Sequence, residues 1–159
     1  MTGLLDHLDR QIASAQRMLQ ILLAQGEAIR RQDVEGVLAR LGDVQAEMVK
    51  RVQLERERDR LVQQAAVLLG CAVPVVTLEG MLQLVDAQTA EAARRKSAEL
   101  RGLLAETTRV HGQNKLLIRQ ELAFLDHLMR VLSGAPQGGY TPVGATPARS
   151  ATRIFDARV

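Results

Sequence analysis

Apolar residues recur with helical spacing through most of the chain, and the pattern breaks only at a few turn-forming residues. Over about Leu4 to Arg31, apolar or small residues follow one another at steps of three and four: Leu5, Leu8, Ile12, Ala15, Leu19, Leu22, Gly26 and Ile29. A heptad pattern sustained over this length predicts a helix with coiled-coil-like packing. Asp33 is a favourable N-cap, so a tight turn before it predicts a second helix antiparallel to the first.

The second helix is expected over about Val34 to Leu69, with Gly70 as its C-terminal stop. Its apolar positions form two slightly offset stripes: Val37, Leu41, Val44, Met48 and Val52, then Leu54, Leu61, Ala65 and Leu68. Between them lies the charged run ERERDR, residues 55–60. Its spacing predicts a solvated face with the i, i+3 pairs Glu55–Arg58 and Glu57–Arg60.

A short third helix and a long fourth one complete the pattern. Residues 71–77 form an apolar link, Thr77 can cap a helix over about Leu78 to Val85, and Asp86 can cap the next helix. This fourth helix should run from about Ala87 to Leu132 and stop at Gly134. At 1.5 Å per residue the first, second and fourth helices are ~42, ~54 and ~69 Å long.

The length of the fourth helix leaves its end without an obvious neighbour. A straight helix would extend ~15 Å past the turn between the first two helices. The overhang, about residues 122–132, is also the most apolar part of the helix, which favours an exposed docking surface. Two alternatives remain open: a bend at Gly102 or Gly112 returns the helix to the bundle, or a second copy covers the overhang.

We therefore predict an all-α protein with two parts. Residues 1–134 should form an antiparallel, coiled-coil-like bundle of three long helices plus one short helix, with 111–132 as an apolar binding segment. Residues 135–159 form a basic tail rich in Gly and Pro, which is too polar to fold alone and is expected to be flexible. Tyr140 and the pair Ile154–Phe155 are candidate anchors in this tail for a partner, or for the bundle itself.

Composition then narrows the classes of function. Only 2% of the residues are aromatic, which argues against an enzyme pocket, and a net charge of +3 is too small to indicate a nucleic-acid surface. The single Cys71 excludes an intrachain disulfide and is expected to pack as a small hydrophobe. Asp6 and Asp9 stand where a signal peptide would be apolar, and no segment suits a membrane span. A cytoplasmic protein is expected.

No catalytic or metal-binding constellation emerges from the residue spacings. The chain has no glycine-rich phosphate loop, no pair of cysteines and no Glu-x-x-His motif. A phosphotransfer histidine would need a lysine and a glycine a few residues downstream. His111 has Lys115, but Gly112 follows it immediately. We expect no enzyme activity, no cofactor and no metal.

The end of the fourth helix and the segment after it carry a specific resemblance. The run HGQNKLLIRQELAFLDHLMRVLSG is followed by GGYTPVG. This combination resembles flagellar export chaperones of the FlgN type, whose long final helix carries an Asn-x-x-Asn-x-x-Leu-Leu-like stretch. In that family a Tyr-x-x-x-Gly segment and a basic, flexible end follow. The resemblance extends over most of the chain, although the first two-thirds are a generic coiled-coil pattern.

The resemblance implies a function and partners. Such chaperones bind hook-associated proteins one and three, which form the hook–filament junction, in the cytosol. They hold the C-terminal helical regions of these subunits, prevent premature self-association and deliver them to the cytosolic domain of the flagellar type III export gate. The export ATPase complex is a further partner of this kind. Neither nucleic-acid binding nor membrane insertion is implied.

The resemblance also assigns residues. Asn114 matches the second Asn of the motif, and His111 stands where the first Asn is usual. Leu116 and Leu117 match the Leu pair, and Leu122 matches an apolar cargo-facing position. Tyr140 matches the tyrosine that docks on the export gate, with Gly144 as its partner glycine.

Physical chemistry supports a helix-binding role for the same segment. Leu117, Leu122, Leu125 and Leu128 have the spacing of anchors for helix-in-groove docking. Asn114 can fix the register of a cargo helix, or equally of the chaperone's own bundle, and Leu125 and Leu128 can instead belong to the chaperone's own core. The rival function is a non-catalytic coiled-coil scaffold or dimerisation subunit, for which the overhang would be the self-association surface.

Overall fold

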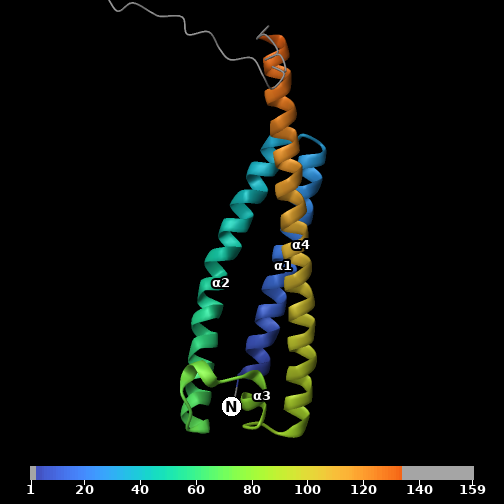
Figure 1. Ribbon diagram of the computed structural model, residues 1–159. Helices are drawn as coiled ribbons and strands as arrows, with labels where there is room; N and C mark the ends of the chain where they lie inside the picture. The colour runs from blue at the N-terminus through green and yellow to red at the C-terminus, as the bar shows by residue number, and fades with distance from the viewer. Residues whose placement is uncertain (1–2, 134–159) are drawn as a thin grey trace, which may run out of the picture. The chain divides into compact units, whose positions relative to one another are not determined.

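The computed structural model describes residues 3–133, and all regular structure in this part is helical (Figure 1). The chain divides into two compact units, Met1–Ala123 and Phe124–Val159, which are described separately. The elements are α1 (Leu4–Arg30), α2 (Val34–Leu69), the 3-10 turn η1 (Val73–Val75), α3 (Leu78–Leu82) and α4 (Ala87–Leu132). Three long helices plus one short helix, packed in antiparallel fashion, confirm the predicted fold class.

The turn between α1 and α2 is formed by the residues that the sequence indicated. The Asp33 side chain accepts a hydrogen bond from the backbone N–H of Gly36 at 2.9 Å, which satisfies one of the free donors at the start of α2. Gln32 has the left-handed φ of 57° that reverses the chain. At its other end α2 stops at Gly70, whose φ of 65° is accessible to glycine at little cost.

The connection from α2 to α4 is capped in the same way. Thr77 Oγ1 accepts a hydrogen bond from the Gly80 N–H at 3.1 Å, and Asp86 Oδ1 accepts one from the Thr89 N–H at 2.9 Å. The predicted apolar link contains η1, with Pro74 at the start of the turn, and α3 ends at Leu82 rather than near Val85. The predicted caps are confirmed, while the third helix is shorter than predicted.

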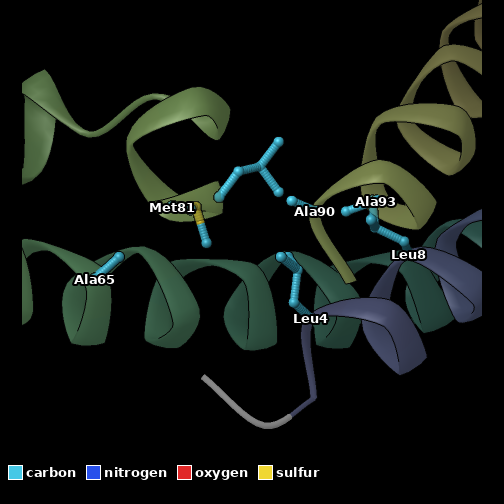
Figure 2. Packing of buried hydrophobic residues seen from close by; sticks show 7 residues of the cluster. Leu4, Leu8, Ala65, Met81, Ala90 and Ala93 are labelled. Atoms are coloured by element: carbon cyan, nitrogen blue, oxygen red, sulfur yellow. The ribbon is translucent and has the colours of Figure 1, made fainter. Parts of the chain in front are cut away.

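The core of the first unit shows the directions of the helices. Leu4 and Leu8, from the start of α1, cluster with Ala65 near the end of α2 and with Ala90 at the start of α4. Met81 of α3 closes this end of the core (Figure 2). A second cluster joins α1 to α4 further along: Met18, Leu22 and Val110, with Val44 of α2 against them. Helix α2 therefore runs antiparallel to α1, and α4 runs parallel to α1.

Helix α1 is the most buried helix because it packs against both α2 and α4. The predicted heptad positions are buried or half-buried, and the apolar stripe is wider than a two-helix seam requires. The additional buried apolar residues are Leu4, Met18 and Ala28. Contact with two neighbours explains the extra width.

Helix α2 differs from the prediction. The expected stripe included Leu41, Met48 and Val52, but these side chains are 45%, 53% and 53% exposed. Val44, another member of the expected stripe, is half-buried against Met18 and Leu22 of α1, and the buried Glu47 lies near it on α2. The predicted stripe combined residues from two adjacent faces of α2, and α1 covers only one of these faces.

The charged run at 55–60 is also only partly as predicted. Arg58 lies 3.2 Å from Glu55, which confirms that exposed pair. Glu57 does not form the expected i, i+3 pair with Arg60. It accepts a hydrogen bond from Arg10 of α1 at 3.0 Å, because it lies on the side of α2 that faces α1.

Helix α4 continues without interruption through Gly102 and Gly112, so neither glycine ends the helix. A Cβ atom built on either glycine meets no atom within 4 Å, so neither is needed for close packing. Cys71 is half-buried beside the end of α2. Among the helices described, none has both the length and the apolar character needed to cross a membrane.

Candidate functional site

The last nine residues of α4, Phe124–Leu132, present a densely apolar surface, which we call the α4 terminal surface. Its apolar side chains are between 40% and 74% exposed. They are Phe124, Leu125, Leu128, Met129, Val131 and Leu132. The polar members include Arg130 and Asp126, which lie 3.4 Å apart as an i, i+4 ion pair. Six exposed apolar side chains in nine residues indicate an interaction surface.

The spacing of these residues continues a pattern from earlier in α4. Within the first unit, Val110 and Asn114 are buried against α1, and Leu117 is half-buried. Counting onward in steps of three and four leads through Glu121 to three leucines: Leu125, Leu128 and Leu132. The helical face that contacts α1 in the first unit therefore continues, by spacing, as exposed leucine positions.

The structure separates the predicted cargo-binding residues into exposed and buried sets. Leu122, Leu125 and Leu128 are 61%, 52% and 40% exposed, and His111 is exposed as well. Leu117 is half-buried, and Asn114 is only 3% exposed. The side chains of the exposed set can contact a partner in the conformation described.

Asn114 lies inside the first unit. Its side-chain N–H groups donate to the Leu22 carbonyl oxygen at 2.7 Å and to Gln25 Oε1 at 3.2 Å, both on α1. These contacts correspond to the alternative in which Asn114 sets the register of the helices within its own bundle. We therefore leave Asn114 out of the exposed surface, because α1 covers it.

A buried carboxylate joins α1 to α2. Glu47 is 2% exposed and accepts a hydrogen bond from Ser14 Oγ at 2.8 Å, while Arg17 Nη2 lies 3.2 Å and Lys50 Nζ 3.5 Å from its oxygens. Burial alone would raise the pKa of Glu47. The hydrogen bonds from Arg17 and Ser14 outweigh burial and lower the pKa below its ordinary value of 4.5. Glu47 is therefore charged and paired at neutral pH.

A buried histidine lies near the other end of the same interface. The His7 side chain is 4% exposed, and its Nε2 is 2.9 Å from Gln11 Nε2. Its Nδ1 is 3.7 Å from Glu57 Oε2, which is too long for a hydrogen bond. Burial lowers the pKa of His7 below 6.5, although the nearby Glu57 carboxylate opposes this shift. Burial in this interface therefore disfavours the charged form of His7.

Residues 3–133 contain no cluster of three or more His, Cys, Asp or Glu side chains arranged to hold a metal ion. Phe124, Met129, Val131 and Leu132 fall within the predicted binding segment 111–132, but the sequence did not single them out as contacts, although all four are exposed there. The signal was present as a helix segment that is apolar on more than one side. Tyr140 and Gly144, proposed for docking on the export gate, lie outside the described residues, as does the whole predicted tail.

Comparison with known protein families identifies the family of this chain. A family model described as "FlgN protein" matches residues 1–148, which is nearly the whole chain. Neither the curated proteins nor the solved structures yield a match. The chain belongs to the FlgN family, the non-catalytic flagellar export chaperones of hook-associated proteins.

Proposed function

We propose that this chaperone holds the C-terminal helical regions of hook-associated proteins one and three on the α4 terminal surface, with Leu122 and His111 as further contacts. The observation that carries the proposal is the exposure of six apolar side chains within Phe124–Leu132. A surface of this density loses unfavourable contact with water when an apolar partner covers it.

The spacing of the leucines indicates the shape of the partner. Leu125, Leu128 and Leu132 continue the spacing at which Val110 and Asn114 contact α1 earlier in α4. An amphipathic cargo helix presents complementary anchors at i, i+3, i+4 and i+7. In this proposal the cargo helix takes, along the end of α4, the role that α1 has along its middle.

Cargo held in this way cannot use the same apolar helix for self-association before export. The chaperone acts in the cytoplasm, as FlgN chaperones do, and delivers its cargo to the cytosolic domain of the export gate. Tyr140, with Gly144, is the proposed docking point on the gate. The export ATPase complex is a further proposed partner.

Calorimetric titration with the C-terminal helical region of a hook-associated protein tests the binding mode. Leu125→Asp and Leu128→Asp should each weaken binding at least about a hundredfold, because a charge replaces an anchor buried in the complex. Val67→Asp is the matched control, since Val67 is an 81% exposed apolar residue on α2 that the proposal does not assign to the cargo. Unchanged affinity of both leucine variants would place the cargo elsewhere.

A further inference from the structure

The α4 terminal surface consists of three pairs of neighbouring apolar residues. The pairs follow one another at steps of four and three: Phe124–Leu125, Leu128–Met129 and Val131–Leu132. All six side chains are exposed. A helix that packs along one other helix needs a single apolar residue at each such step. The α4 terminal surface therefore carries twice the apolar positions that one cargo helix requires.

The pairs form two rows along α4. The first row holds the first member of each pair, Phe124, Leu128 and Val131, and the second row holds Leu125, Met129 and Leu132. A shift of one residue turns a helix by about 100°, so the two rows are centred about 100° apart. The outermost positions, Val131 and Met129, lie about 160° apart around the helix axis. A single packed helix cannot bury both of them.

Helix α1 carries the same kind of pair where it packs against two helices. Its neighbouring buried residues are His7–Leu8, Ser14–Ala15, Gln25–Gly26 and Ala28–Ile29. Ser14 donates a hydrogen bond to Glu47 of α2. Leu22, seven residues beyond Ala15, clusters with Val110 of α4. In this chain, pairs of apolar or buried neighbours at helical steps therefore accompany a helix that has a different neighbour on each side.

The remaining side of α4 is polar over the same turns. Asp126, His127 and Arg130 are exposed, and Arg130 pairs with Asp126. At about 100° per residue these three positions lie together, on the side opposite the two rows. The end of α4 can thus accept two apolar neighbours, whereas a third neighbour would have to bury charged groups.

We propose that the α4 terminal surface receives two helices of one cargo chain, one on each row, so that chaperone and cargo form a three-helix bundle there. This inference rests on the proposed function and specifies the cargo as a helical hairpin with an apolar stripe on each helix. The three leucines lie at the inner edges of the rows and contact both cargo helices. Because the two helices are linked, binding of the first raises the effective concentration of the second.

Two other sources of a second helix fit the sequence less well. The segment after α4 contains Pro136, Pro142 and Pro147, and proline interrupts a helix. The α4 terminal surface of a second copy of this chain would cover only one row of its partner. The other row of each copy would then stay exposed to water. A cargo hairpin covers both rows of a single chain at once.

Calorimetric titration of the full chain with the C-terminal helical region of a hook-associated protein distinguishes two helices from one. Val131→Asp and Met129→Asp should each weaken binding at least about tenfold, because each places a charge beneath a different cargo helix. Ala123→Asp is the control, since Ala123 is exposed and precedes His127 and Arg130 at steps of four and three. Far-UV circular dichroism should be alike for all three variants, because all three positions are exposed.

The outcomes separate this inference from the proposed function. If only one of the two variants, or neither, weakens binding while Leu125→Asp still does, the cargo is a single helix and the hairpin is wrong. If none of the aspartate variants on the α4 terminal surface alters the affinity, the proposed cargo site itself is wrong.

The composition of the complex and the length of the cargo give two further measurements. Sedimentation equilibrium should show one chaperone with one cargo chain, and a second chain of either kind would overturn the hairpin. A cargo fragment shortened to its last helix should bind at least about tenfold more weakly than the whole region. Its affinity should respond to only one of Val131→Asp and Met129→Asp. Equal affinity of the short and long fragments would show that the second helix makes no contact.

Discussion

The side-chain oxygen of Asn114 on α4 occupies the space that a methyl group on Gly26 of α1 would need. A Cβ atom built on Gly26 would lie 2.6 Å from Asn114 Oδ1, which is closer than such atoms approach. The amide nitrogen of the same side chain donates to the Leu22 carbonyl oxygen at 2.7 Å. The glycine and the asparagine together fix the axial register of α4 on α1.

Gly26→Ala should therefore destabilise the protein, although alanine is the better helix former. The methyl group must displace Asn114 and break its buried hydrogen bonds, which we expect to cost about 1–3 kcal/mol. Urea denaturation followed by circular dichroism measures the loss.

Gly102→Ala and Gly112→Ala are the matched controls. Both glycines lie in the interior of α4, and a Cβ on either meets nothing within 4 Å. Each alanine should stabilise by up to about 1 kcal/mol through helix propensity alone. An equal gain for Gly26→Ala would show that the contact with Asn114 does not constrain the helices.

Leu122→Ala and Leu117→Ala should have different effects. Leu122 is 61% exposed, so its truncation should weaken cargo binding about tenfold or more and leave the urea midpoint unchanged. Leu117 is half-buried, so its truncation should also lower the free energy of unfolding by about 1–2 kcal/mol. Loss of the helical signal in Leu122→Ala would identify that residue as core.

Glu47 should make stability depend on acid pH. Its folded pKa is below 4.5, so its contribution is fully present above pH 4.5 and is lost as the pH falls from there through the folded pKa. Glu47→Gln should flatten the stability curve in that range and lower stability at pH 7. Denaturation midpoints measured between pH 3 and 7 check both effects, with Glu55→Gln as an exposed control. A variant curve parallel to that of the parent protein would contradict the role of the paired carboxylate.

His7 should add a separate dependence at higher pH. Because burial lowers its pKa below 6.5, the unfolded chain binds a proton more readily than the folded chain. Stability should be complete above pH 6.5 and fall as the pH drops below that value. His7→Leu should remove this slope, whereas His111→Leu, at an exposed position, should leave it in place. Persistence of the slope in His7→Leu would assign it to other groups.

Tyr140→Ala should impair docking on the export gate without affecting cargo binding, the other proposed activity. Cargo affinity should stay the same, while export of hook-associated proteins and pull-down by the cytosolic gate domain should fall. Thr146→Ala changes a side chain of the same segment to which no role is assigned and is the control. Unchanged gate binding by Tyr140→Ala would refute the docking role.

The boundaries of the helices could be predicted because they depend on neighbouring residues. Asp33, Thr77 and Asp86 each bond to an N–H three residues ahead, and Gly70 supplies a left-handed φ. The ending of α4 at Leu132 follows similarly from the apolar pattern and Gly134. Such signals need no knowledge of the tertiary structure.

The sequence could not predict in the same way which face of a helix packs against a neighbouring helix. On α2 two apolar faces adjoin, and only packing on α1 decides that Val44 is covered while Leu41 is not. For Asn114 the sequence was equally consistent with a contact to the cargo helix and with a contact inside the bundle. Its burial depends on Gly26, a residue of another helix that no local pattern connects to it. These outcomes depend on contacts between residues that are distant in sequence.

The modest burial of α2 has a consequence for motion within the first unit. The buried side chains of α2 are Glu47, Ala65 and Ala66. Glu47 is the member of this set in the amino-terminal half of α2, and its carboxylate is held by ion pairs with Arg17 and Lys50. Local opening is easiest where few apolar contacts are lost. The amino-terminal half of α2 is therefore the part that separates from α1 at the lowest free energy, while the contacts of α1 with α4 persist. Backbone amides there should exchange with solvent through brief openings rather than through global unfolding.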